Sequence, residues 1–160
     1  FILKKNHEST IEIKTINLLK NKREEFQFQL NSEIKKPNYT VPKKYLFEPN
    51  AAIMKSGGFD KIALQFEVGK LHQHSHLYTS DELLDFPGRI FEIKKTLEYN
   101  KTNMKSFLEN KKANITTRNF PETVENIRKK WKIKDGGNLY SFFTTDMTNS
   151  KIVVLCEKLK

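Results

Sequence analysis

The sequence predicts an α/β (α+β) fold, with a mixed sheet whose elements follow the order β-α-β-α-β-β in the C-terminal part. From residue 89 onward, short strand-like segments alternate with amphipathic helical segments, which is typical of a sheet covered by helices. Hydrophobic residues make up 37% of the 160 residues and include twelve Phe, so the chain has enough apolar surface to form a core. No apolar run approaches the roughly 20 residues of a membrane-spanning helix, so we expect no membrane partner.

The N-terminal segment is predicted to form a β-hairpin. Apolar and polar residues alternate over Thr10–Leu18 and again over Glu25–Leu30, and a polar turn separates the two runs. Residues 1–5 are expected to be the end of a helix. Because a hairpin alone buries too little surface to fold, we interpret residues 1–34 as the remnant of a small α/β domain. The chain begins at Phe1 inside an apolar run, so we expect it to be a fragment of a longer protein.

Short helices are expected after a linker. Residues 35–44 are polar with two prolines, which predicts the linker. Pro49 suits the first turn of a helix that runs into Met54, and Gly57-Gly58 suits the end of that helix. A second short helix is predicted over residues 60–66.

The segment LHQHSHLYT, residues 71–79, carries three histidines at alternating positions. On a strand, His72, His74 and His76 would share one face and could converge on a metal ion. No acidic residue or cysteine nearby adds further ligands at the usual spacing of a metal site. We therefore favour a polar strand or loop and assign no metal-binding residue.

Two amphipathic helices are predicted in the C-terminal part, and each carries an apolar stripe that should face the sheet. The stripes are Met104, Phe107 and Leu108 in the first helix and Val124, Ile127 and Trp131 in the second. Asn119 is the candidate cap of the second helix, and Pro121 suits its first turn. The predicted strands are residues 89–99, 113–117, 139–145 and 151–159, and the predicted helices are residues 102–110 and 121–132.

No self-sufficient active site is visible in the sequence. The chain has no dinucleotide-binding GxGxxG, no phosphate-binding GxxxxGK(S/T), no GxSxG and no HExxH motif. The one cysteine, Cys156, lies in the apolar run KIVVLCEKL, which favours a buried strand residue over a nucleophile. A single cysteine forms no internal disulfide and fits a reducing, cytoplasmic location. We assign no catalytic residue to this chain.

The positive charge of the chain is concentrated in one segment. The net charge is +10, and residues 101–134 hold ten Lys or Arg against three Glu, which is +7 of the +10. Such an excess attracts polyanions, of which nucleic acid is the commonest. Arg118 is the preferred anchor, because arginine makes forked phosphate contacts and this one precedes a predicted helix N-terminus. The candidate nucleic-acid-binding residues are Arg89, Lys112, Arg118, Arg128, Lys129 and Lys132.

Structural alternatives remain open for these residues. The basic side chains of the second helix also fit a solvated surface above a buried Trp131. Arg89 and Arg118 could instead pair with Glu48 or Asp81 and tie parts of the fold together.

Four segments of the chain together resemble a known family. They are YLFEPNAAIMKSGGFDKIA, SHLYTSDELL, FPGRIFEI and ANITTRNFPETVENIRKKWKIKDGG, in this order and spacing. They are similar to the THUMP-like domain at the C-terminal end of a bacterial family assigned as class I S-adenosylmethionine-dependent methyltransferases. The similarity covers about residues 45–160, and residues 1–34 resemble the end of the ferredoxin-like domain that precedes it in that family.

The resemblance implies a parent methyltransferase with a separate, Rossmann-like N-terminal domain. That domain would bind S-adenosyl-L-methionine and carry the catalytic residues, so no cofactor is expected in this chain. By analogy with THUMP domains, the resemblance also implies RNA binding or substrate presentation.

We therefore interpret the chain as the non-catalytic, RNA-recognising C-terminal region of a cytoplasmic methyltransferase. Its expected partners are RNA and the N-terminal methyltransferase domain of the same protein. One alternative is a structural or docking module that packs on the methyltransferase domain, or dimerises it, and binds no nucleic acid. Another is a stand-alone enzyme that uses the three histidines with a metal ion.

Overall fold

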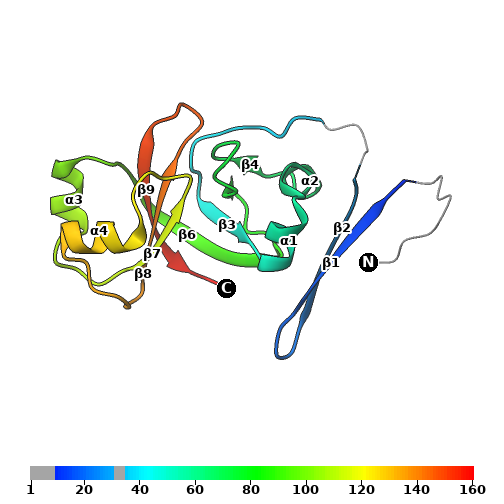
Figure 1. The fold of residues 1–160 in the computed structure, drawn as a ribbon, viewed down its shortest axis with the longest axis horizontal. Helices are drawn as coiled ribbons and strands as arrows, with labels where there is room; N and C mark the ends of the chain where they lie inside the picture. Colours follow the sequence, from blue (N-terminus) through cyan, green and yellow to red (C-terminus); the bar gives the residue numbers. More distant parts are fainter. Residues whose placement is uncertain (1–9, 31–34) are drawn as a thin grey trace.

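The computed structural model describes residues 10–30 and 35–160, so the helix end predicted at residues 1–5 lies outside the described residues. The described residues form two sheets (Figure 1). One is a hairpin in which β1 (Glu12–Leu18) pairs antiparallel with β2 (Arg23–Gln29). The hairpin predicted from the alternating pattern is therefore confirmed.

The main sheet has seven strands in the spatial order β4-β5-β3-β6-β9-β8-β7. Its strands are β3 (Tyr45–Pro49), β4 (Gly69–Lys70), β5 (Tyr78–Ser80), β6 (Gly88–Glu98), β7 (Asn114–Arg118), β8 (Leu139–Thr145) and β9 (Lys151–Lys158). The helices are α1 (Ala51–Ser56), α2 (Phe59–Gln65), α3 (Lys101–Phe107) and α4 (Val124–Trp131).

The predicted mixed α/β fold is confirmed. From β6 onward the elements follow the expected order β-α-β-α-β-β. Neighbouring strands of the main sheet are antiparallel, except for β7 and β8, which run parallel. Parallel neighbours need a crossover connection, and α4 supplies it between these two strands.

The helices α3 and α4 pack on the sheet through the predicted apolar stripes. Met104 and Leu108 of the first stripe are fully buried, and Phe107 is half-buried. In the second stripe, Ile127 and Trp131 are buried, whereas Val124 is half-buried. All of these side chains except Val124 belong to one core cluster with residues of β6, β8 and β9.

A β-bulge in β6 decides which residues of this strand face that cluster. The register with β9 shifts between Ile93 and Lys95. Without the shift, Ile93 and Leu97 would share a face, because alternate residues of a strand point the same way. With the shift, Ile93 packs against the cluster on the other face, while Leu97 joins the cluster under α3 and α4.

The helices α1 and α2 cover a second cluster, which also includes the hairpin. Phe26 of β2 is buried against Phe47 of β3 and the helical residues Ile53 and Ile62. A Cβ atom on Gly58 would come within 2.7 Å of the Phe28 ring, so a glycine allows the hairpin to approach this closely. The hairpin is therefore part of the packed structure (Figure 1).

The starts of α1 and α4 differ from the prediction. Pro49 is the last residue of β3, and Asn50 caps α1 by accepting a hydrogen bond from the amide of Ile53. The cap of α4 is Thr123, not Asn119. Asn119 has a left-handed backbone with φ 50° and uses its side chain elsewhere, so the helix begins later.

Gly57 ends α1 as predicted, in a left-handed conformation with φ 75° that suits glycine.

Of the two alternatives for residues 71–79, a polar strand or a loop, the structure shows mostly a loop, and only the last two residues enter β5. The sequence pattern did not reveal β3, because Leu46 and Phe47 are both buried on opposite faces and no alternation results.

Over residues 10–30 and 35–160, no helix is long and apolar enough to cross a membrane.

Candidate nucleic-acid interface

The helices α3 and α4 lie at one end of the main sheet (Figure 1). Their exposed lysines form a basic surface, which comprises Lys101, Lys105, Lys129, Lys130 and Lys132. A cavity of about 500 Å³ opens between the two helices. It combines lysines with two aromatic rings, which is the combination that tracks phosphates and stacks bases. Its lining residues are Tyr99, Asn100, Lys101, Lys105, Glu109, Lys130 and Trp131.

The aromatic wall of this cavity is held by a polar network. The Tyr99 hydroxyl donates to Oε1 of Glu122 at 2.6 Å and accepts from the Trp131 indole at 3.2 Å. The Lys130 ammonium lies 5.3 Å and 5.4 Å from the centroids of the two rings and donates to the Tyr99 oxygen at 3.1 Å. That hydrogen bond raises the pKa of Lys130 and offsets the opposite effect of burial. Lys130 therefore stays charged against the aromatic wall.

The opposite wall carries Lys101 and Lys105. These residues are four apart, so their side chains project from the same face of α3. Both are exposed, and neither forms an ion pair with a residue of the described ranges. Two unneutralised ammonium groups therefore border the cavity.

Three of the predicted interface residues are also exposed lysines. Lys129 lies on α4, and Lys132 ends α4 with φ 52°. Lys112 precedes β7 and bridges its backbone to Lys134. In the part of the chain that the structure describes, no ion pair neutralises these three side chains. They remain candidates for phosphate contacts.

Arg128 has a structural role in this region. Its guanidinium donates to the carbonyl oxygens of Ala113 at 3.2 Å and Ile133 at 3.4 Å, and it pairs with Asp135 at 2.5 Å. These bonds join the end of α4 to the segment before β7. RNA binding by Arg128 stays a prediction, but most of its donors have internal acceptors.

Arg89 and Arg118 both pair with one buried carboxylate, that of Glu48, whose side chain is 3% exposed. Arg118 donates from Nη2 to Oε1 at 2.7 Å, and Arg89 donates from Nε to Oε2 at 2.6 Å. Of the two acids considered from the sequence, Glu48 is thus the partner, whereas Asp81 pairs with Lys43. We call the three residues Arg89, Glu48 and Arg118 the arginine clamp.

The arginine clamp joins strands that are distant in the sheet, and its two guanidinium groups remain partly exposed to solvent. Glu48 lies on β3, Arg89 is the second residue of β6, and Arg118 ends β7 at the far edge of the sheet. The two arginine side chains are 43% and 36% exposed, and the cluster carries a net charge of +1. An internal clamp and a phosphate contact are therefore compatible, and the second stays a prediction.

The three histidines do not converge. Nδ1 of His72 accepts from the backbone amide of His74 at 3.1 Å and lies 3.0 Å from the Asn119 amide. Its Nε2 lies 3.1 Å from Oδ1 of Asn149, so His72 holds the loop against two other turns. The His76 ring stacks on Phe59 instead. No cluster of three or more metal-ligating side chains occurs within residues 10–30 and 35–160.

Family comparisons divide the chain into two matched parts. A model of a ferredoxin-like domain matches residues 45–87, and a model of a THUMP domain-like family matches residues 88–158. The chain carries a ferredoxin-like domain followed by a THUMP-like domain. The resemblance read from the sequence motifs is therefore confirmed.

One solved structure is similar to most of the chain. The chain is similar to a crystal structure described as a "putative methyltransferase from Porphyromonas gingivalis W83", with 32% sequence identity and a TM-score of 0.84. The similarity covers 93% of this chain but only 38% of that protein. No curated protein matches the chain.

The matched ranges differ from the ranges that we expected. We expected the ferredoxin-like part in residues 1–34 and the THUMP-like domain over 45–160, whereas the ferredoxin-like match begins at residue 45 and neither match includes the hairpin. The predicted division at residues 35–44 stays a prediction. In the matched ranges, the basic surface belongs to the THUMP-like domain, and the arginine clamp joins both domains.

The sequence reasoning overlooked the aromatic cavity of the THUMP-like domain. Lys101, Lys105 and Lys130 lie in the basic segment but are not among the six predicted site residues. The four-residue spacing of the first two is a signal of a shared helix face. The contact between Tyr99 and Trp131 joins residues 32 positions apart, so it depends on how α3 and α4 pack.

Proposed function

We propose that this chain is the RNA-recognising, non-catalytic part of a methyltransferase. The basic aromatic cavity between α3 and α4 carries the proposal. It is lined by Lys101 and Lys105, which form no ion pair with a described residue, and by the Tyr99 ring, against which Lys130 is held by its pair with Glu122. Phosphate contacts from lysine supply affinity with little sequence preference. Aromatic faces add stacking with unpaired bases. The likeness to a methyltransferase structure supports the assignment of the parent activity.

A salt series tests the binding proposal. We expect structured and single-stranded RNA to bind this chain with an affinity that falls linearly in a log–log plot against salt. The slope should be about −0.7 to −0.9 for each neutralised phosphate. Filter binding or fluorescence anisotropy measures both affinity and slope. If no RNA binds at low salt, the proposal is wrong.

A charge-matched pair of variants locates the interface. The test variant changes Lys101, Lys105, Lys129 and Lys132 to Gln. The control changes Lys20, Lys35, Lys36 and Lys55 to Gln, which are exposed lysines outside the THUMP-like domain. Both variants lower the net charge equally, so only the test variant should weaken RNA binding strongly and reduce the salt slope by up to about 3. Equal effects would show general charge attraction without a specific surface.

The cofactor of the proposed enzyme is assigned to the part of the protein outside this chain. S-adenosyl-L-methionine sites of Rossmann-like domains use a glycine-rich turn between a strand and a helix. Among the described residues, Gly57-Gly58 separates two helices, and Gly136-Gly137 precedes a strand. Neither pair fits that turn. We therefore propose that S-adenosyl-L-methionine binds a methyltransferase domain elsewhere in the whole protein, and that this domain is a partner of the present chain. We also propose that the whole protein is cytoplasmic.

A docking role is the second candidate. The exposed side of the hairpin carries aliphatic residues, with Leu18 76% exposed and Ile16 46% exposed. Two of the six predicted RNA contacts, Arg89 and Arg118, also have a structural partner in Glu48. A module that packs on the methyltransferase domain would show both features. Replacing Ile16 and Leu18 by Ser in the whole protein should then weaken the contact between domains and leave RNA affinity unchanged.

A further inference from the structure

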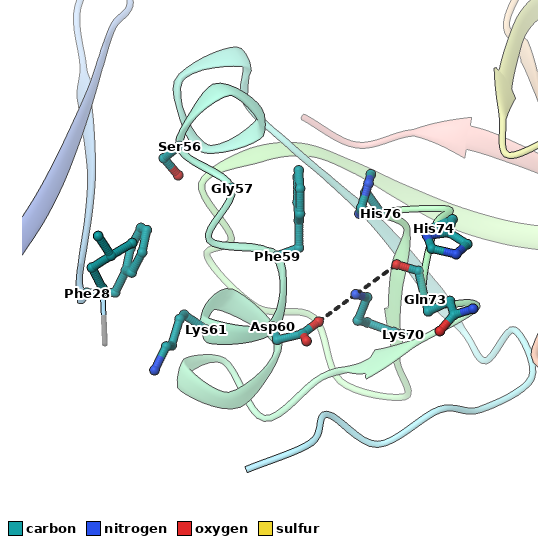
Figure 2. Close-up of a pocket in the computed structure, with 11 residues that line it drawn as sticks. Phe28, Ser56, Gly57, Phe59, Asp60, Lys61, Lys70, Gln73, His74 and His76 are labelled. Atoms are coloured by element: carbon teal, nitrogen blue, oxygen red, sulfur yellow. Dashed lines mark hydrogen bonds and ion pairs between the residues drawn. The ribbon is translucent and has the colours of Figure 1, made fainter. Parts of the chain in front are cut away.

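A second cavity lies in the ferredoxin-like domain, beside the hairpin (Figure 2). Its volume is about 530 Å³, which is within the usual range of ligand pockets, about 300–1,000 Å³. The cavity is lined by Phe28, Leu30, Ser56, Gly57, Phe59, Asp60, Lys61, Lys70, Gln73, His74 and His76. Neither family match nor the basic surface assigns a role to it.

A buried lysine, Lys70, lines one end of this cavity. Lys70 is 1% exposed, although lysine is almost never fully buried unless it is paired. Its ammonium group donates to Oδ1 of Asp60 at 2.7 Å and to the carbonyl oxygen of Gln73 at 3.3 Å. The third N–H has no hydrogen-bond acceptor among the described residues. The ammonium also lies 6.0 Å from the centroid of the Tyr39 ring.

A strained histidine with an unsatisfied nitrogen lies beside it. His76 has a left-handed backbone with φ 52°, an uncommon conformation that concentrates at binding and active sites. Its Nδ1 atom is buried and has no hydrogen-bond partner among the described residues. Burial, followed by the charges of Lys70 and Arg118, lowers the pKa of His76 to about 4. The ring is therefore neutral near pH 7 and offers a donor or an acceptor.

Aromatic rings form the walls. The rings of His76 and Phe59 are stacked, with centroids 3.6 Å apart. Figure 2 shows this pair on one side of the cavity and Phe28 from the hairpin on the other. Asp60 lies next to Lys70, and its side chain is 38% exposed (Figure 2). A planar ring in the cavity would contact aromatic side chains from α2 and from the hairpin, with hydrogen-bonding groups of Asp60 and Gln73 beside them.

The pairing of charged side chains in the cavity favours a neutral ligand over an anionic one. Asp60 neutralises the Lys70 ammonium at 2.7 Å, so a free phosphate or carboxylate would meet no uncompensated cation there. A neutral ring with donors and acceptors on its edge fits better. Nucleobases have this chemistry, and proteins recognise unpaired RNA bases by stacking and edge hydrogen bonds.

The cavity also lies near the arginine clamp. The charge of Arg118 acts on His76, and Asn119, the next residue in the chain, contacts His72 of the loop that lines the cavity. The partly exposed guanidiniums of Arg89 and Arg118 are candidates for phosphate contacts with the same RNA strand.

We propose that this cavity holds one unstacked nucleobase of a bound RNA. The inference rests on the proposed RNA binding and adds a specific base site in the ferredoxin-like domain.

The test uses single-stranded RNA in which 2-aminopurine replaces the base at each position in turn, and a matched RNA with an abasic site at each position. Insertion between aromatic rings should change the 2-aminopurine fluorescence at one position. Removal of that base should weaken binding by about fivefold to a hundredfold, the range measured for stacking on aromatic residues.

Two variants and one control test whether the fluorescence change of 2-aminopurine arises from binding in the cavity. Phe59→Leu removes the stacking face, and Gln73→Trp fills the cavity from an exposed position without changing the core. Phe66→Leu is the control, because Phe66 is equally half-buried and packs on Phe86 outside the cavity lining. Both cavity variants should lose the fluorescence change and the preference for intact over abasic RNA, and the control should keep both.

The outcomes separate this inference from the proposed function. RNA binding with no position-specific fluorescence change, or an equal loss in the control, overturns the base site alone. No RNA binding at low salt overturns the proposed function and the base site together. Full competition by free 5′-AMP at the concentration of the RNA would show a free-nucleotide site and overturn the assignment to RNA.

Discussion

Single residues determine which positive side chains form internal ion pairs and which remain free to contact a ligand. Glu48 holds two arginines that the charge pattern alone assigns to nucleic acid, and both pairs use charge-assisted hydrogen bonds. The buried carboxylate needs these partners, since a buried charge without a counter-charge is costly. The same contacts fix the orientation of both guanidiniums toward solvent.

Glu48→Gln tests the arginine clamp. The change keeps the side-chain shape but removes the charge, so the two guanidiniums lose their counter-ion. Because both arginines are partly exposed and screened by water, we expect a loss of about 1–3 kcal/mol in the free energy of unfolding, less than for a fully buried pair. Urea denaturation measures it. The control Asp81→Asn, which breaks an exposed pair with Lys43, should cost under about 0.5 kcal/mol; equal costs would contradict the clamp.

The folded state should lose stability in mild acid through His76. Its folded pKa of about 4 lies below the ordinary value of 6.5, so the unfolded chain takes up a proton first as the pH falls. The contribution of His76 is therefore present above pH 6.5 and is lost between about pH 6.5 and 4. Since the side chain is only partly buried, we expect a loss of about 1–2 kcal/mol.

Denaturation of the parent chain and of His76→Gln across this pH window measures the effect. Acidic groups also titrate in this pH range. Burial raises the pKa of Glu24, but the hydrogen bonds from Lys160, Asn50 and Asn17 together lower it further, so its pKa lies below the ordinary value. Such groups contribute equally to both curves, so their effect cancels in the comparison. The variant should show a flatter pH dependence. Parallel curves would contradict the assignment to His76.

At the scale of elements, helix ends were the least predictable features. Thr123 caps α4 through a hydrogen bond from the amide of Asn126 at 3.2 Å, while Asn119 holds the loop of His72. Both residues are good cap formers. Only the path of the chain between them, set by tertiary contacts, distinguishes the two.

Thr123→Ala should lower the free energy of unfolding by about 0.5–2 kcal/mol, the usual value of a lost N-cap. Thermal or urea denaturation gives the difference. Thr102→Ala is the matched control, because Thr102 is exposed inside α3 and Asn100 caps that helix. If both changes have the same effect, Thr123 does not cap α4.

At the scale of the whole molecule, the two matched domains share one sheet. The boundary between the family matches falls between residues 87 and 88, yet β3 on one side pairs with β6 on the other along five residue pairs. The arginine clamp crosses the same boundary. We therefore expect the two domains to unfold together.

The hairpin should belong to the same cooperative unit. Phe26 is 2% exposed in the cluster under α1 and α2, so Phe26→Ala should cost about 3–5 kcal/mol through lost burial and the cavity left behind. Chemical denaturation followed by circular dichroism measures the loss. Ile16→Ala on the exposed side should change stability by under about 0.5 kcal/mol. A Phe26→Ala effect that small would mean that the hairpin is detached.

The sequence by itself determined the elements with strong periodicity and the family. The hairpin, β6 to β9 and the apolar stripes of α3 and α4 follow local patterns, because burial of one face requires a repeat of two or 3.6 residues. Only the tertiary structure decided the partners of charged and aromatic side chains. The contacts of Glu48 with Arg118 and of Tyr99 with Trp131 join residues 70 and 32 positions apart. No local periodicity encodes such pairs, since they depend on sheet order, the bulge in β6 and helix packing.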